Sequence, residues 1–284
     1  MPLQSLSAIS SRFLENLVRV VILEDALAVA RCAAEESIQA LGLSRNTAPT
    51  PHRAVVGLAT GGTPLGLYRE WIERYQHGSI SFAHIASFNL DEYVGLSPDH
   101  PGSYHHYMQH HLFQNIDIDP SFTHLPKTDV KDLNASARDY EWLIETSGGI
   151  DLQILGIGTE GHIGFNEIGS SLSSGTRVKT LTQKTRQDNA RYFPRLEDVP
   201  TMAITMGLGT IMNAQSILLL ATGGSKARAI RDAVEGPITA MMPASILQFH
   251  PDVTLIVDTE AASLLAHQEF YRESETNRQK LLQQ

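Results

Sequence analysis

The chain has 284 residues, of which 42% are hydrophobic, so it is long enough to bury the core of one large domain or two small ones. Asp and Glu outnumber Lys and Arg by 31 to 22, and the net charge of −9 excludes a general attraction for nucleic acid or an anionic membrane. Cys32 is the only cysteine, which excludes a disulfide framework, and neither a signal peptide nor a membrane-spanning run is recognised, so we expect a cytoplasmic protein.

Short apolar segments alternate with helical segments along the chain. A strand is predicted at 18–23, a helix at 24–41 and a polar surface loop at 44–53. Further strand segments follow at 54–59, 85–90, 151–158, 216–224 and 252–258, and further helices at 64–75 and 225–236. Because these strands lack period-two alternation and are separated by helices, they predict a mostly parallel sheet covered on both faces. Ligands of such sheets bind at the carboxyl ends of the strands.

Two strands end in nearly the same glycine-rich turn, LATGGT at 58–63 and LATGGS at 220–225. Each leads into a predicted helix, whose free N–H groups and dipole attract an anion. The turns therefore predict a phosphate site, and Lys226 directly after the second turn favours it. Neither turn matches a nucleotide-binding fingerprint, and two ordinary capped turns are the alternative.

Titratable residues follow two other strands. Asp91 comes at the end of the strand at 85–90, where a carboxylate can accept a proton from carbon or simply cap a turn. In LGIGTEGHIGFNE (155–167), His162 stands between Glu160 and Glu167, which could hold the imidazole charged or in one tautomer. A structural histidine is the alternative.

Several motifs together resemble the glucosamine-6-phosphate deaminase family, which is also called glucosamine-6-phosphate isomerase. They are ATGGTP, FNLDEYVGL followed by HPGSY, GIGTEGHIGFNE, RVKTLT, TMGLGTIM and GGSKA followed by VEGP. The resemblance implies a single-domain, Rossmann-like three-layer α/β sandwich, and we predict one such domain over 1–284. It also implies an isomerising hydrolase that converts glucosamine 6-phosphate and water to fructose 6-phosphate and ammonia, without metal or organic cofactor.

The resemblance also implies the roles of the acid/base residues. Asp91 matches the base that moves a proton from C2 to C1, and His162 matches the acid/base that opens the sugar ring. Glu167 matches a carboxylate that orients the histidine, and two nearby carboxylates predict a raised His162 pKa. Glu160 stands where the family commonly has Asp or Asn, which leaves its role open.

Two further sets of residues are implied by the same resemblance. The substrate phosphate is expected to bind Thr60, Gly61, Gly62, Thr63, Arg186 and Lys226. In some family members, an allosteric N-acetylglucosamine 6-phosphate site between the subunits of a homo-oligomer would match Ser170, Ser171, Arg177, Lys179 and Thr180. A basic strand with solvated hydroxyls is the alternative. His106 and His110 stand one helical turn apart, but no carboxylate or cysteine completes a ligand set, so no metal is expected.

Two other functions remain as alternatives to the deaminase. The 6-phosphogluconolactonases share the implied fold, but their motifs carry DER and SLFP where this chain has DEY and FNE. A sugar-phosphate sensor would usually add a basic recognition helix, which the first 50 residues lack, and would lose the acid/base residues. The expected partner is therefore a small amino sugar phosphate, and neither nucleic acid nor a membrane.

Overall fold

Seven parallel strands form the central sheet of the computed structural model, which describes residues 18–45 and 53–283. Their order is β1-β10-β9-β6-β2-β3-β5, and every strand pairs with its neighbour in parallel. The strands are β1 (Arg19–Leu23), β2 (Ala54–Leu58), β3 (Ile85–Asn89), β5 (Thr123–His124), β6 (Leu152–Gly156), β9 (Ser216–Ala221) and β10 (Val253–Asp258). The predicted parallel sheet is confirmed.

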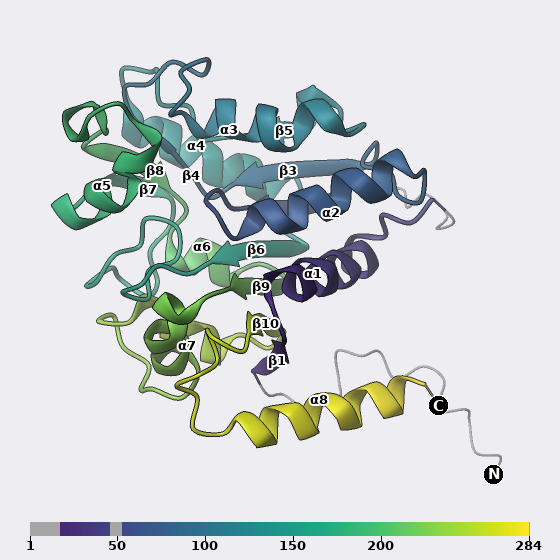
Figure 1. Cartoon of the computed structure of the whole chain (residues 1–284). Helices are drawn as coiled ribbons and strands as arrows, with labels where there is room; N and C mark the ends of the chain where they lie inside the picture. The colour runs from purple at the N-terminus through teal and green to yellow at the C-terminus, as the bar shows by residue number, and fades with distance from the viewer. Residues whose placement is uncertain (1–17, 46–52, 284) are drawn as a thin grey trace, which may run out of the picture.

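One face of the sheet is covered by α1 (Ala26–Leu41), α2 (Pro64–Gln76) and α3 (Tyr104–His111), of which α1 and α2 lie in front of the strands in Figure 1. Asp25 caps α1 by accepting from the Ala28 N–H, and Gly42 ends it in the left-handed conformation. The helices bury large side chains against the strands, among them Trp71 and Met108. This packing places the N-terminal ends of α2 and α3 at the carboxyl ends of the strands, where the ligand site is predicted.

The opposite face is covered by α4 (Leu133–Thr146), α6 (Leu208–Met212) and α7 (Ala227–Val234). Tyr140 of α4, Leu208 of α6 and Ile230 of α7 belong to one buried cluster with the strand residues of this face. Helices on both faces of a parallel sheet make the three-layer α/β sandwich that the sequence predicts. The extension of this single domain over all of 1–284 stays a prediction.

A second, antiparallel sheet lies at the carboxyl end of the first, with the order β4-β8-β7. It consists of β4 (Asp91–Tyr93), β7 (Arg177–Thr180) and β8 (Met202–Thr205), and α5 (Gln183–Asn189) follows β7. An aromatic cluster of Tyr93, Phe165 and Phe193 fills the space beside it. The sequence did not predict this sheet, in which the chain continues from β3 directly into β4.

The C-terminal helix α8 (Gln268–Leu282) runs along the edge strand β1, near the bottom of Figure 1. None of its residues is buried, and ionic contacts hold it: Arg19 of β1 binds Glu275 at 2.8 Å and Glu36 of α1 at 2.8 Å. Short 3₁₀ segments complete the chain: η2 (Phe113–Asn115), η3 (Pro120–Phe122), η4 (Ala190–Tyr192), η5 (Leu196–Asp198), η6 (Gly224–Lys226) and η7 (Pro243–Phe249).

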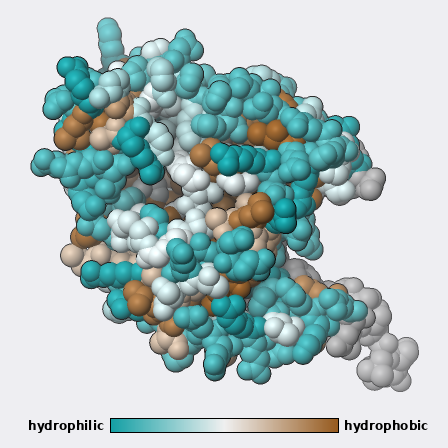
Figure 2. Space-filling model, in the orientation of Figure 1, coloured by the Kyte–Doolittle hydropathy of each residue, from teal (hydrophilic) through white to brown (hydrophobic). Residues whose placement is uncertain are grey.

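The surface in Figure 2 is mostly hydrophilic, which agrees with the strong net charge. Among the helices within 18–45 and 53–283, none combines the length and apolar character needed to cross a bilayer. The N-terminal segment tested for a signal peptide, and most of the loop predicted at 44–53, lie outside the described residues.

Candidate active site

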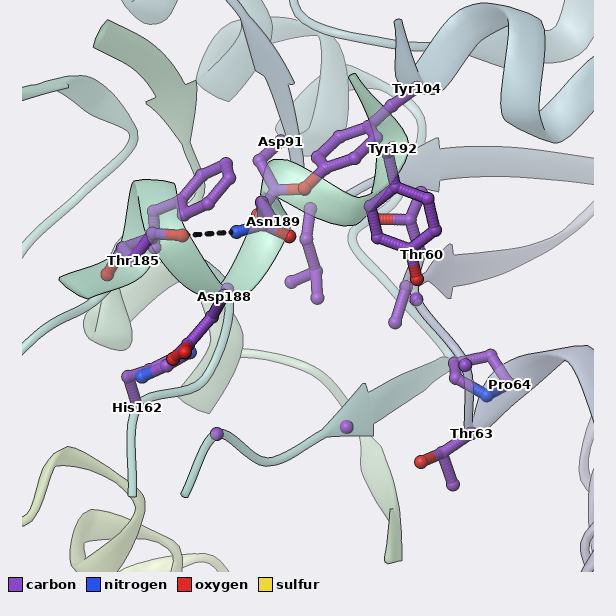
Figure 3. A pocket seen from close by; sticks show the side chains of 18 of the residues that line it. Thr60, Thr63, Pro64, Asp91, Tyr104, His162, Thr185, Asp188, Asn189 and Tyr192 are labelled. Atoms are coloured by element: carbon purple, nitrogen blue, oxygen red, sulfur yellow. Dashed lines mark hydrogen bonds between the residues drawn. The ribbon is translucent and has the colours of Figure 1, made fainter. Parts of the chain in front are cut away.

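A cavity of about 600 Å³ opens at the carboxyl ends of β2, β6 and β9. Its walls come from both sheets, from α3 and α5, and from the two glycine-rich turns (Figure 3). The predicted residues that line it are Asp91, His162, Thr60, Gly61, Gly62, Thr63 and Lys226. The structure thus brings together predicted residues from four separate segments of the chain.

Asp91 begins β4 at the cavity wall and is 5% exposed. Its carboxylate has no hydrogen-bond partner among the described residues. Burial, and then the neighbouring charge of Glu92, raise the pKa of Asp91 to about 8. Gly164 lies close by at φ 55°, and a Cβ there would be 3.5 Å from Asp91 Oδ2 and 3.0 Å from Thr205 Oγ1. The glycine therefore lets the loop after His162 pass beside the carboxylate.

His162 lies on the same cavity with its imidazole stacked over the backbone of Gly158. A Cβ at Gly158 would come 2.1 Å from His162 Cε1, so a larger residue at 158 would displace the imidazole. Burial lowers the pKa of His162, and the positive charge of Lys226 lowers it further against the opposing carboxylates of Glu167, Glu160 and Asp188. The predicted raised pKa is wrong, because desolvation and Lys226 outweigh the carboxylates.

Glu167 and Glu160 lie outside the lining of the cavity. Glu167 Oε1 accepts from the Thr182 N–H at 3.2 Å, from Thr182 Oγ1 at 2.7 Å and from the hydroxyl of Thr185. The carboxylate therefore holds the start of α5, and no hydrogen bond joins it to His162 within the described structure. Glu160 is exposed in the turn before His162. Both carboxylates act on the imidazole through charge alone in this conformation.

The first glycine-rich turn faces the cavity with its backbone. Gly61 has φ 105°, and Pro64 at the first position of α2 has no N–H to offer. Within residues 18–45 and 53–283, no group accepts from the N–H groups of Gly61, Gly62 or Thr63. Tyr107 Oη donates to the Gly61 carbonyl at 2.6 Å and fixes the turn. Free N–H groups at a helix N-terminus suit an anion, as the sequence predicted.

The second glycine-rich turn contributes a side chain instead. The Gly223 N–H donates to both Asp258 carboxylate oxygens, at 3.0 and 2.9 Å, and the Gly224 N–H donates to Glu260 at 3.2 Å. Lys226 lines the cavity, and burial and then Arg191 lower its pKa against the charge of Asp188. The first turn thus presents its backbone to the cavity, and the second is followed by the Lys226 side chain.

Arg186 does not line the cavity, so its predicted phosphate contact is wrong for this conformation. Its guanidinium donates to the carbonyls of Val199 at 3.1 Å and Leu196 at 3.0 Å. Arg191 lines the cavity instead, and after burial its positive charge is the next cause that lowers the pKa of Lys226, so the two cations are near each other. Both arginines lie in TRQDNARYF, and composition alone does not separate them.

Sequence reasoning also missed several side chains from α3 and α5. Tyr104 and Tyr107 of α3 form one wall, and Asp188 of α5 reaches the cavity, where Figure 3 shows its carboxylate beside the His162 imidazole. Tyr192 closes the side near Thr60 in the same view. The HPGSY motif contains Tyr104, and this was the one signal in the sequence that could have identified it.

The residues predicted for an effector site lie away from the cavity, on the loop before β7 and on β7 itself. Ser170 is buried, and its hydroxyl has no hydrogen-bond partner. Arg177 Nη1 donates to the Gly175 carbonyl at 3.4 Å. The predicted set is Ser170, Ser171, Arg177, Lys179 and Thr180, and none of these lines the substrate cavity.

The fold and the cavity define a class of α/β proteins whose ligand site lies at the carboxyl edge of a parallel sheet. The model of the family described as glucosamine-6-phosphate isomerases/6-phosphogluconolactonase matches residues 24–256. This match covers more than half of the chain, and the chain therefore belongs to that family.

Within the family, the chain is most informatively compared with deaminases. It is 52% identical over 263 residues to the glucosamine-6-phosphate deaminase of Hahella chejuensis, covering 92% of this chain and 98% of the relative. It is 50% identical to that of Cellvibrio japonicus, covering 93% and 98%. A solved structure of a monomeric glucosamine-6-phosphate deaminase matches with a TM-score of 0.82 at 47% identity, covering 87% of this chain and all of that one.

A more distant structural match separates the fold from the activity. The 6-phosphogluconolactonase from Trypanosoma cruzi superposes with a TM-score of 0.69 at 20% identity, covering 88% of this chain and 97% of that one. Identity at this level shows a shared fold and nothing about the reaction. The deaminase relatives are the ones that bear on the chemistry.

Proposed function

We propose that this chain is a glucosamine-6-phosphate deaminase, which converts glucosamine 6-phosphate and water to fructose 6-phosphate and ammonia. The observation that carries the proposal is one cavity lined by Asp91, His162, the free N–H groups of the first glycine-rich turn and Lys226. Deaminase relatives at 50–52% identity over nearly the whole chain support it. In this proposal the turn and Lys226 hold the phosphate, and Asp91 and His162 act on the other end of the sugar.

His162 opens the sugar ring in this mechanism. The lowered pKa leaves the imidazole neutral near pH 7, so it can accept the proton of the C1 hydroxyl. It then returns a proton to the ring oxygen as the C1–O5 bond breaks, which leaves the open-chain aldehyde. Burial and then Lys226 lower the pKa of the imidazole, and the carboxylates of Glu167, Glu160 and Asp188 oppose them.

Asp91 moves the carbon-bound proton. Once the aldehyde has formed, the Asp91 carboxylate removes the acidified C2 proton and the enolamine takes it back at C1. The resulting C2 iminium adds water and releases ammonia, which leaves the C2 ketone of fructose 6-phosphate. A carboxylate with a pKa of about 8 is a stronger base than an exposed one. Its base form is lost as the pH falls through that value.

Arg191 extends the proposed phosphate site and replaces Arg186 in it. Its guanidinium is on the same side of the cavity as Lys226, and a planar guanidinium binds phosphate oxygens in pairs. Arg191→Ala should therefore weaken phosphosugar binding, whereas Arg186→Ala should mainly lower thermal stability.

The first test is the reaction itself. Purified, EDTA-treated protein is incubated with glucosamine 6-phosphate, and ammonia and fructose 6-phosphate are measured together. Equal amounts of the two products support the proposal, and Asp91→Asn should lose most turnover. Asp139→Asn, which changes an exposed carboxylate on α4, is the matched control. If the unaltered protein forms no product but hydrolyses 6-phosphogluconolactone, the assignment changes from deaminase to lactonase.

The proposed effector site is tested in the same assay. We propose that Ser170, Arg177 and Lys179 bind N-acetylglucosamine 6-phosphate in an assembly of subunits. Addition of that sugar should lower the Michaelis constant for the substrate, and Arg177→Ala should abolish the response without changing basal turnover. If the added sugar does not change the dependence of rate on substrate concentration, Arg177 and Lys179 belong to a basic strand without an effector site.

A further inference from the structure

Glu92 is a buried carboxylate that follows Asp91 directly but points away from the cavity. It is 5% exposed, and its two oxygens accept three backbone hydrogen bonds. Oε1 accepts from the N–H groups of Tyr93 at 2.8 Å and Tyr104 at 2.9 Å, and Oε2 accepts from the N–H of His105 at 2.8 Å. One side chain therefore joins the strand of Asp91 to the first turn of α3.

Glu92 and Ser103 together cap the N-terminus of α3. Ser103 Oγ accepts from the His106 N–H at 3.0 Å, so the first N–H groups of α3 all have a side-chain partner. Glu92 differs from Ser103 because it belongs to another element and carries a charge. A buried carboxylate with three N–H donors is strongly held, since each of these hydrogen bonds is charge-assisted.

The helix held by Glu92 carries two walls of the cavity. Tyr104 lines it beside Asp91, and Tyr107 lines it near the first glycine-rich turn. The Tyr107 hydroxyl donates to the Gly61 carbonyl at 2.6 Å. A continuous set of contacts thus runs from Glu92 through α3 to Gly61, from the catalytic strand to the proposed phosphate turn.

We propose that Glu92 is a positioning residue, which fixes α3 relative to the strand of Asp91 and thereby sets the distance between the proton-transfer end and the phosphate end of the site. The proposal rests on the proposed deaminase function. It assigns no contact with substrate to Glu92, which acts through Tyr104 and Tyr107.

The charge of Glu92 gives a second readout. It is the second cause of the raised pKa of Asp91, after burial. The other titratable groups that interact with Asp91 or Glu92 are Tyr93 on β4, Tyr104 and His105 on α3, and Tyr140 on α4. The tyrosines remain neutral near pH 8, because burial raises their pKa values. Removal of the Glu92 charge should therefore lower the pKa of Asp91.

Two variants separate the reach of Glu92 from its charge. Glu92→Gln keeps the length but presents an amide N–H₂ to one of the N–H donors, and Glu92→Asp keeps the charge but shortens the side chain. Both should raise the Michaelis constant for glucosamine 6-phosphate by about tenfold, because a displaced α3 moves Tyr104 and Tyr107 away from the substrate. Only Glu92→Gln should move the acid limb of kcat/KM to lower pH.

Amide hydrogen exchange tests the coupling without any assay of activity. In both variants the Tyr104 and His105 amides should exchange faster, whereas Asp132→Ala should speed exchange only near Ala135, which Asp132 caps on α4. If Glu92→Gln fails to fold, Glu92→Asp still gives the exchange rates and the Michaelis constant.

Two outcomes would contradict the proposal. If the Michaelis constant and the acid limb are unchanged in Glu92→Gln, Glu92 is only a helix cap. If the unaltered protein lacks deaminase activity, the proposed function fails, and unchanged exchange at Tyr104 and His105 would then separately overturn the coupling.

Discussion

The two glycine-rich turns, at 58–63 and 220–225, differ in one residue of six and yet serve the cavity in different ways. Both place their first glycine at positive φ, 105° at Gly61 and 85° at Gly223, so the motif fixes the same kind of backbone twice. The first turn leaves its N–H groups free towards the cavity. The second turn uses its N–H groups inside the protein and offers the Lys226 ammonium.

The difference comes from residues outside the motif. Asp258 at the end of β10 and Glu260 just beyond it accept from Gly223 and Gly224. No carboxylate within the described structure does this for Gly61 and Gly62. A repeated motif therefore predicts the conformation of a turn, whereas its neighbours decide whether the turn binds a ligand.

The largest effect should come from the side chain that only the second turn supplies. Lys226→Ala should raise the Michaelis constant for glucosamine 6-phosphate by about 100-fold, because a hydrogen bond between charged groups contributes about 1.5–3 kcal/mol. Unphosphorylated glucosamine should be affected little. Arg228→Ala removes an exposed charge from the same helix and is the control. Equal losses for both sugars in steady-state kinetics would contradict a phosphate contact.

A change in the backbone of the first turn should raise the Michaelis constant less than loss of Lys226 does, but still measurably. Gly61→Ala should raise the same Michaelis constant about tenfold, because an L-residue at this φ costs about 1–2 kcal/mol and shifts the free N–H groups. A Cβ at 61 meets nothing within 4 Å, so the effect is conformational and not steric. A circular dichroism melt would confirm folding, and unchanged binding would show that the turn's N–H groups do not hold the phosphate.

The elements that the sequence predicted well are those set by local chemistry. Apolar runs without alternation specify buried parallel strands, and Gly61 and Gly223 specify turns with positive φ. The sheet of β4, β7 and β8 was missed because its strands are three or four residues long and, as DEY and RVKT, largely polar. Strands this short are stabilised by pairing and give no periodic signal of their own.

Residues of the candidate site were predicted where a local motif marks them, and properties that depend on contacts between distant segments were missed. Asp91 and His162 follow strand ends, and both line the cavity. The pKa of His162 was predicted in the wrong direction because Glu160 and Glu167 are near it in sequence, whereas its burial and Lys226 belong to the tertiary structure. Arg186 was predicted and Arg191 was missed, because the sequence does not reveal the change from α5 to the 3₁₀ turn η4 before Arg191.

The two turns should also differ in their response to pH. Burial and Arg191 lower the pKa of Lys226, so its charge is lost at a lower pH than that of an exposed lysine. Phosphosugar affinity should therefore fall as the pH rises towards that pKa, whereas backbone N–H groups do not titrate. We expect the Michaelis constant to rise towards the alkaline end of the stable range. In Lys226→Ala it should stay flat, and a parallel rise there would assign the titration to another group.

The smallest effect is expected at the second glycine of the second turn, and it sharpens the comparison most directly. Gly224 has no positive φ, a Cβ there meets nothing within 4 Å, and it does not line the cavity. Gly224→Ala should therefore leave the Michaelis constant within about twofold and stabilise the protein by about 0.4–1 kcal/mol, because alanine has less freedom when unfolded. Thermal unfolding and steady-state kinetics on Gly61→Ala and Gly224→Ala together test this contrast. A loss of affinity at Gly224→Ala as large as that at Gly61→Ala would mean that the second turn also binds the phosphate through its backbone, and that Asp258 and Glu260 release it on binding.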